Sequence, residues 1–198
     1  MSILLLIALF AFFNRELNIT EMSSTEALVS ELNNNPNDPN SFSRPDLCRV
    51  THIQWKASVN FEEQLIEGTV DLTVEKLNKT TNEVILDTSG LSISEVKDRD
   101  TKEKLKYELS PALKAFGSKL SIKLLPKNMS TISITYKTSK EATALQWLKP
   151  EQTAGKSKPY MFSQCQAIHC RSLLPIQDTP GVKARYEATV GFILKSRL

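Results

Sequence analysis

Apolar and polar residues alternate with a period of two through much of this chain, and this pattern limits what it can fold into. The clearest segments are 53–61 and 68–74, where every second residue is apolar or small. Residues 84–86 predict a short, fully apolar strand, and apolar residues recur at every second position in 91–93, 120–124, 132–136 and 182–190. A period of two places one face of a strand on a core and the other face in water. The sequence therefore predicts an all-β protein with a saddle-like antiparallel β-sandwich.

The first 13 residues are almost continuously apolar. This run is shorter than the roughly 20 residues that a membrane span requires, so it predicts no firm membrane anchor. Its length is typical of a signal-peptide core, but no Lys or Arg precedes it and no clean small-x-small cleavage site follows. Three Asn-x-Ser/Thr sequons begin at Asn18, Asn78 and Asn128. They do not decide the compartment by themselves.

Residues 14–40 predict a helix followed by a linker. Ser24 can cap a short helix that reaches Leu32, with Leu28, Val29 and Leu32 on one face. The Asn- and Pro-rich residues 33–40 disfavour both helix and strand. We therefore expect a domain boundary here and a single β-domain over residues 41–190.

Charge and cysteine content narrow the class of protein. The chain has 25 Lys and Arg against 22 Asp and Glu, without a dense basic patch, which disfavours nucleic acid as a partner. Three cysteines are an odd number, which disfavours a disulfide framework and favours reduced thiols. We therefore expect a cytoplasmic protein, and a secreted one is the alternative if residues 1–13 act as a signal peptide.

A cluster of polar residues interrupts the apolar pattern between residues 144 and 180. Gln164 and Gln166 flank a cysteine, and on a strand they would point the same way. Neutral amides among apolar residues are typical of a pocket wall, where they can hold a peptide backbone or a hydroxyl. They could equally satisfy neighbouring backbone groups. Residues 177–180 predict a turn in which Asp178 bonds its own backbone.

Catalytic and metal-binding patterns have little support. His52 and His169 are the only histidines, and no His-Glu-x-x-His pair occurs. Cys165, His169 and Cys170 could be imagined as metal ligands, but a fourth ligand is not obvious, so buried thiols beside a hydrogen-bonded histidine are favoured. A cysteine nucleophile has no recognisable oxyanion loop. We expect no catalytic residue and no metal in this chain.

Several motifs in the same order resemble the leukotriene A4 hydrolase branch of the zinc aminopeptidases (M1 family, gluzincin catalytic domain). The main ones are Ala144-Leu-Gln-Trp-Leu148, Phe162-Ser-Gln-Cys-Gln-Ala-Ile-His-Cys-Arg171 and Gln177-Asp-Thr-Pro180. The resemblance covers about three quarters of the chain, from near residue 40 to residue 190. Residues 1–40 do not share it, and 191–198 form a divergent tail.

The resemblance implies an N-terminal β-saddle that positions substrate. The zinc ligands and catalytic residues would lie in a following catalytic domain, normally in the same chain and absent here. Zinc and substrates, either peptide N-termini or a lipid epoxide, are thus expected only for the complete enzyme.

By the same resemblance, Gln164, Cys165, Gln166 and Ala167 would reach into the active-site cleft and contact substrate. Gln166 would help to position the N-terminal residue of the substrate, and Gln164 would lie deeper. A different class of function stays open: a stand-alone, non-catalytic β-sandwich binding module, which would be secreted if residues 1–13 act as a signal peptide.

Overall fold

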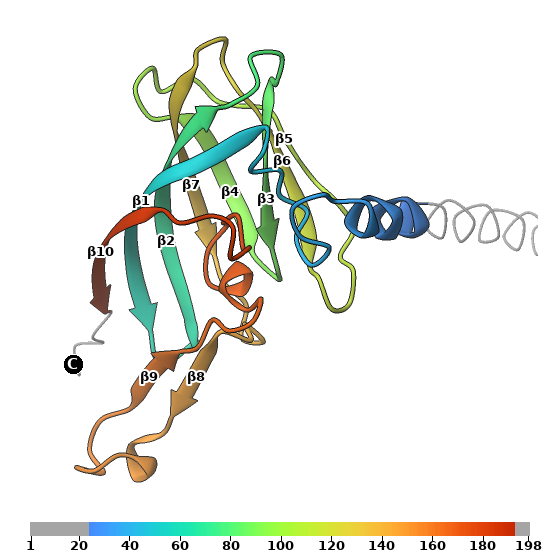
Figure 1. Ribbon diagram of the computed structural model, residues 1–198. Helices are drawn as coiled ribbons and strands as arrows, with labels where there is room; N and C mark the ends of the chain where they lie inside the picture. The colour runs from blue at the N-terminus through green and yellow to red at the C-terminus, as the bar shows by residue number, and fades with distance from the viewer. Residues whose placement is uncertain (1–23, 193–198) are drawn as a thin grey trace, which may run out of the picture.

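A computed structural model describes residues 24–192 of the chain (Figure 1). The strands in these residues form three sheets. The five-stranded sheet has the order β10-β1-β2-β7-β4, the three-stranded sheet β3-β6-β5, and β8 and β9 form a hairpin. The strands are β1 (Cys48–Asn60), β2 (Leu65–Lys76), β3 (Glu83–Thr88), β4 (Ser92–Asp98), β5 (Tyr107–Leu109), β6 (Ser118–Lys123), β7 (Met129–Lys137), β8 (Leu145–Leu148), β9 (Tyr160–Ser163) and β10 (Arg185–Phe192). Two short 3-10 helices, η1 (Pro150–Gln152) and η2 (Cys170–Ser172), lie in the connections.

The core lies where the five-stranded and three-stranded sheets face each other. Val70 and Leu72 of β2 are fully buried, as are Leu120 and Ile122 of β6. Their polar neighbours in sequence, such as Asp71, remain at least partly exposed. The predicted all-β fold with mainly antiparallel pairing is confirmed. Alternate side chains of each of these strands point to the core and to solvent, as a period of two requires.

β10 departs from the predicted pattern in two ways. It pairs with β1 in the parallel direction, from His52↔Arg185 to Val59↔Phe192. All eight of its residues are exposed, so the alternation over 182–190 does not bury one face here. β10 is the edge strand and pairs with β1 on one side only, and the exposure of all its residues shows that no described element covers either of its faces.

A helix over residues 24–33 lies beside the three-stranded sheet (Figure 1). Leu28 and Leu32 pack with Phe42 and Leu113 in a second, smaller apolar cluster. Val29 is 42% exposed, so it does not share the buried face predicted for it. No helix in residues 24–192 is long and apolar enough to cross a membrane. The apolar leader over residues 1–13 and most of the tail over 191–198 lie outside the described residues.

Candidate functional site

The β8–β9 hairpin leads the chain into the glutamine-containing segment. β8 and β9 pair from Leu148↔Tyr160 to Leu145↔Ser163. The amide of Gln164 donates to the carbonyl of Ala144 at 2.9 Å, which closes the ladder. Because the strand ends at Ser163, Gln164 and Gln166 do not lie on a strand, and the prediction that they point the same way for that reason is wrong.

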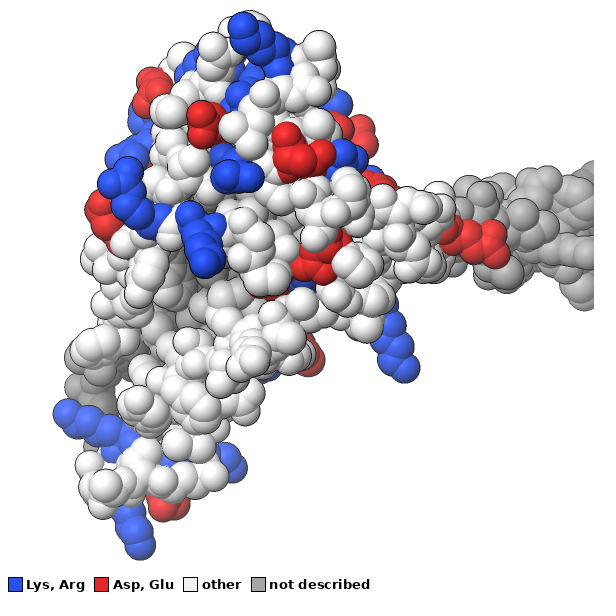
Figure 2. Space-filling view, viewed as in Figure 1, with Lys and Arg blue, Asp and Glu red and all other residues white. Residues whose placement is uncertain are grey.

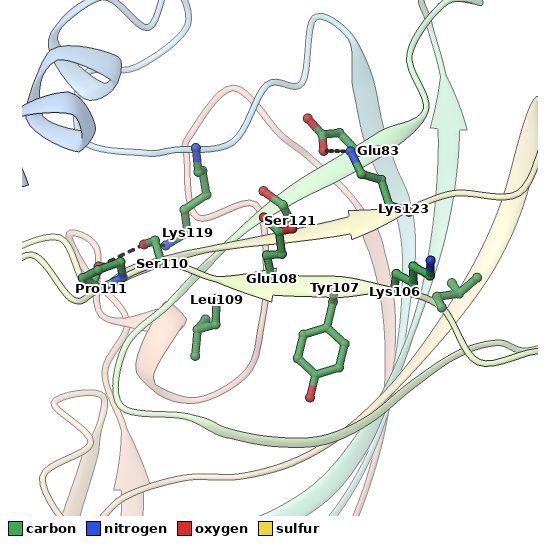
Figure 3. Close-up of a pocket in the computed structure, with 11 residues that line it drawn as sticks. Glu83, Lys106, Tyr107, Glu108, Leu109, Ser110, Pro111, Lys119, Ser121 and Lys123 are labelled. Carbon is green, nitrogen blue, oxygen red and sulfur yellow. Dashed lines mark hydrogen bonds and ion pairs between the residues drawn. The ribbon is translucent and has the colours of Figure 1, made fainter. Parts of the chain in front are cut away.

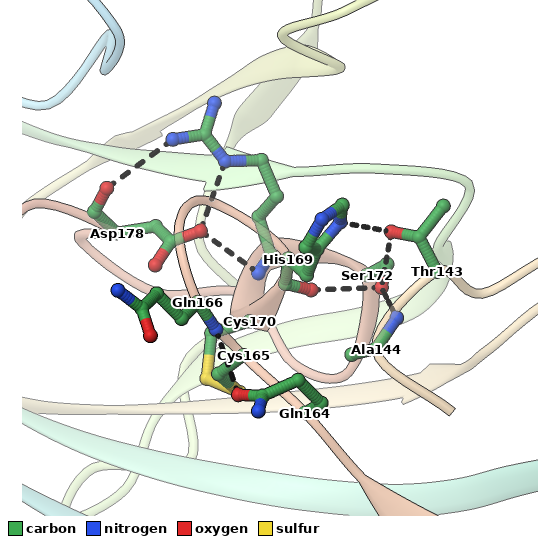
Figure 4. The surroundings of a disulfide bond; sticks show 10 residues. Thr143, Ala144, Gln164, Cys165, Gln166, His169, Cys170, Ser172 and Asp178 are labelled. Atoms are coloured by element: carbon green, nitrogen blue, oxygen red, sulfur yellow. Dashed lines mark hydrogen bonds and ion pairs between the residues drawn. A yellow bond between two sulfur atoms is a disulfide. The ribbon is translucent and has the colours of Figure 1, made fainter. Parts of the chain in front are cut away.

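Residues 164–170 form a compact turn (Figure 4). The amide of Gln166 donates to the side-chain oxygen of Gln164 at 3.2 Å, and that of His169 to the carbonyl of Cys165 at 2.9 Å. The peptide bond between Gln166 and Ala167 is cis. Gln164, Gln166 and Ala167 are exposed, and Cys165 is half-buried. The turn therefore presents its glutamine amides at the surface.

A disulfide between Cys165 and Cys170 closes this turn (Figure 4). The two Cα atoms lie 4.5 Å apart across five positions of sequence. The preference for reduced thiols, drawn from the odd cysteine count, is therefore wrong for this pair. An odd count excludes complete pairing and leaves a single bridge free to form, with the third cysteine, Cys48, buried and free.

Hydrogen bonds fix the back of the turn to residues 143 and 144, which directly precede β8. His169 Nδ1 lies 2.8 Å from Thr143 Oγ1. Ser172 Oγ donates to the carbonyl of His169 at 2.8 Å and accepts from the amide of Ala144 at 2.9 Å. Both the ring and the backbone carbonyl of His169 therefore take part in hydrogen bonds that hold the turn in place. This agrees with the prediction that His169 is a hydrogen-bonded histidine and not a metal ligand.

Arg171 anchors the segment in the interior and is only 1% exposed. Its Nε donates to the Asp178 carboxylate at 3.0 Å, and Nη1 and Nη2 donate to the carbonyls of Phe116 and Asn40 at 2.8 and 2.9 Å. Asp87 Oδ1 lies 3.9 Å from Nη1. One guanidinium thus joins four segments that are distant in sequence. Sequence reasoning marked Arg171 only as a polar residue in an apolar run.

Asp87 is the buried acidic partner in this node. Its carboxylate accepts hydrogen bonds from the hydroxyl of Ser41 at 2.6 Å and from the amides of Phe42 and Asp178 at 2.8 and 3.0 Å. Burial raises the pKa of the Asp87 carboxyl, and Arg171 together with these donors opposes the rise. The node stabilises the junction of β3, the segment before β1 and the segment after η2.

Residues 177 and 178 do not form the self-contained turn that was predicted. Asp178 directs its carboxylate to Arg171, so the prediction that it bonds its own backbone is wrong. Gln177 is buried and bonds to the start of β1, just before the register shift between Val50 and His52: it accepts from the amide of Val50 at 2.9 Å and donates to the carbonyl of Cys48 at 2.7 Å. Both side chains found tertiary partners that a local pattern cannot reveal.

The described residues, 24–192, offer no donor set that fits a zinc ion. No group of three or more His, Cys, Asp or Glu side chains there is arranged to hold a metal ion. Cys165 and Cys170 are bonded to each other, which removes both thiolates from the imagined Cys-His-Cys site. The described residues therefore do not fit a catalytic zinc.

A broad groove lies elsewhere, over the exposed face of β5 and β6 (Figure 3). Lys123 pairs with Glu83 at 2.8 Å in its wall, and Lys119 pairs with Glu31 of the helix. Figure 2 shows acidic and basic groups interspersed over the upper part of the visible face. None of residues 164–167 lines the groove, and we assign it no ligand.

Comparison with known proteins agrees with the fold and identifies the family. Residues 49–196 match the Peptidase M1 N-terminal domain. A leukotriene A-4 hydrolase homolog of Botryotinia fuckeliana is 40% identical over 173 residues, which cover 85% of this chain and 26% of that protein. A leucine aminopeptidase 2 of Ajellomyces capsulatus is 46% identical over 164 residues, covering 78% and 25%.

Solved structures of M1 peptidases contain a domain with the same fold. Yeast LTA4 hydrolase in complex with bestatin superimposes with a TM-score of 0.73 at 36% identity, covering 79% of this chain and 25% of that one. An M1 zinc metallopeptidase of Deinococcus radiodurans, at 17% identity and a TM-score of 0.54, shares the fold. The chain spans about a quarter of the length of the relatives that it matches. It belongs to the M1 peptidase family, and what it contains is the N-terminal domain of a leukotriene A4 hydrolase-like aminopeptidase.

Proposed function

We propose that this domain positions the N-terminus of a peptide substrate in a zinc aminopeptidase, and that residues 164–167 form the contact. Peptides are the substrate class that we assign, because the relatives at 40–46% identity include several named leucine aminopeptidase 2. A lipid epoxide would use the same surface in a complete enzyme of the hydrolase type.

One observation carries this proposal: Gln166 presents a free amide on a firmly held turn. Its side chain is exposed and takes part in no hydrogen bond within the described residues. The side chain of Gln164, in contrast, is engaged within the turn: its Oε1 accepts a hydrogen bond from the backbone amide of Gln166 (Figure 4). An uncharged amide can accept a hydrogen bond from a peptide ammonium while leaving the pKa of nearby acids unperturbed.

The surroundings of the turn support a positioning role. The disulfide closes it, Ser172 and Thr143 hold its back, and Arg171 fixes its far end in the core. A contact group held on a pre-organised element loses little entropy when a substrate binds. A zinc ion in the complete enzyme would supply Lewis-acid chemistry, and residues 24–192 contain no cluster of three or more His, Cys, Asp or Glu side chains that could hold it.

The test replaces the corresponding region of yeast LTA4 hydrolase with residues 49–196 and measures aminopeptidase kinetics. In this chimera, Gln166→Ala should lower kcat/KM about tenfold to hundredfold, because a hydrogen bond to a charged group contributes roughly 1.5–3 kcal/mol. Gln146→Ala truncates another exposed glutamine, on β8, and is the matched control.

Equal kcat/KM for the Gln166→Ala and Gln146→Ala chimeras would show that the turn does not contact substrate. An N-terminally acetylated peptide gives a further check, since it lacks the ammonium group. The unmutated chimera should prefer the free amine strongly, and Gln166→Ala should reduce that preference.

A further inference from the structure

The connection between β2 and β3 forms an exposed turn with a defined shape. The amides of Leu77 and Asn78 both donate to the carbonyl of Leu47, at 3.0 and 3.1 Å. The amide of Thr81 then donates to the carbonyl of Asn78 at 3.1 Å. The side chains of residues 78–80 are exposed. The turn is therefore ordered in its backbone and open to solvent in its side chains.

This turn is also the sequon Asn78-Lys-Thr80. Asn78 Oδ1 accepts hydrogen bonds from the amide and the hydroxyl of Thr80, at 3.0 and 2.8 Å. Asn78 Nδ2 has no hydrogen bond within the described residues. The hydroxyl of the sequon thus engages the oxygen of the amide, and the nitrogen, the atom that carries an N-linked sugar, is left free.

The second sequon in the described part of the chain has a different setting. Ser130, which supplies its hydroxyl, is only 4% exposed and its Oγ is buried. The carbonyl of Asn128 accepts from the amide of Lys76 at 2.9 Å, which ties the acceptor residue to β2. Folding therefore presents one complete sequon, that of Asn78, and withdraws the hydroxyl of the other. The sequon at Asn18 lies outside the described residues.

One disulfide and one buried thiol account for the three cysteines. Cys165 and Cys170 form a disulfide, and both residues are partly accessible to solvent. Disulfides of this kind persist in oxidising compartments and are rare in the cytosol, where thiols are kept reduced. The unpaired Cys48 is 2% exposed, and burial raises the pKa of its thiol to about 11, so little reactive thiolate forms there. The apolar run over residues 1–13 has the length of a signal-peptide core.

We propose that Asn78 is an acceptor for an N-linked glycan and that this chain folds in the secretory compartment where such glycans are attached. The sugar donor is a lipid-pyrophosphate-linked oligosaccharide. A bond forms between Asn78 Nδ2 and the anomeric carbon, the bond from that carbon to the phosphate oxygen breaks, and the lipid pyrophosphate leaves with the electron pair. The amide nitrogen gives up one proton to a base of the transferase.

A glycan at this position is compatible with the candidate site. The β2–β3 connection lies at the opposite end of the molecule from the β8–β9 hairpin (Figure 1). Glycans are bulky and need a surface position, which this turn provides. The modification therefore leaves residues 164–167 uncovered, and it is independent of whether they contact substrate.

The test is to express the complete 198-residue chain, with its own N-terminus, in cultured eukaryotic cells. Treatment with peptide N-glycosidase should increase its gel mobility, and mass spectrometry should find Asn78 converted to Asp in the treated protein. Asn128 should keep its amide. An untreated chain with an unmodified Asn78 would overturn the proposal.

Matched variants separate the sequon from effects on folding. Thr80→Ser keeps a hydroxyl and should keep the glycan, whereas Thr80→Ala and Asn78→Gln should lose it, and Ser130→Ala should change nothing. Circular dichroism confirms that each variant folds. Modification that appears only after a foreign signal peptide is attached would also overturn the proposal, because the chain would then not reach the transferase by itself.

Discussion

At the scale of single residues, the buried guanidinium of Arg171 explains how the exposed turn over residues 164–170 stays fixed. It donates hydrogen bonds to three backbone carbonyls, those of Asn40, Phe116 and Asp178, and to the carboxylate of Asp178. A charge buried in this way is stabilised only while its whole hydrogen-bond network is present. The position of the turn therefore depends on a side chain that is itself buried.

Replacement of Arg171 by Met should lower the free energy of unfolding by about 3–5 kcal/mol, because it removes the positive charge beside the buried carboxylate of Asp87 and the hydrogen bond to Asp178. Urea denaturation followed by circular dichroism measures this loss. Arg99→Met is the control: the Arg99 side chain is 44% exposed and pairs with Asp71 at the surface, so its loss should cost less than about 1 kcal/mol. Similar losses in the two variants would contradict the role given to Arg171.

At the scale of the element, the segment 164–170 combines a turn, a disulfide and a hydrogen-bonded histidine. The turn follows directly from a short hairpin that has little burial of its own, since Tyr160 and Phe162 of β9 are 56% and 41% exposed. Packing therefore contributes less to its order than cross-linking and hydrogen bonding do.

The disulfide should accordingly contribute to stability. A bridge that closes so short a loop is worth about 2 kcal/mol on a chain-entropy basis. The double variant Cys165→Ser, Cys170→Ser should lose that amount in urea denaturation. A dithiol reductant should destabilise the parent chain to the same extent and leave the double variant unchanged. If reductant has no effect on the parent chain, the bridge does not stabilise it.

At the scale of the whole molecule, the described surface includes an apolar edge. Tyr186, Val190 and Phe192 of β10 are 77%, 51% and 62% exposed, and β10 is the edge strand of the largest sheet. Long edge strands with apolar side chains are sites of association between chains. Taken alone, this domain should therefore be prone to self-association.

The 198-residue chain should show concentration-dependent association in sedimentation equilibrium. Val190→Lys combined with Phe192→Lys should weaken it by about tenfold or more, because charge on an edge strand opposes pairing. Met129→Lys is the control, since Met129 is 57% exposed on another strand of the same sheet. Equal association in both variants would exclude β10 as the contact.

Much of the fold was predictable because alternation is a local property. The strands around Val70 and Ile134 were identified from their spacing, and both residues are fully buried. β5, β8 and β9 were missed as strands, because runs of three or four residues carry too little periodicity to identify. The exposure of β10 was missed for another reason: periodicity predicts a two-faced strand, but it does not say whether a neighbour covers either face.

The sequence by itself determined the fold class, the family and the segment 164–167 as the candidate contact, because each of these is written in consecutive residues. Tertiary structure decided the rest. The pairing of Cys165 with Cys170 depends on how the chain turns between them, and the role of Arg171 depends on carbonyls of Asn40 and Phe116 that lie 131 and 55 positions away. Partners so remote in sequence meet only through folding, so no local pattern encodes them.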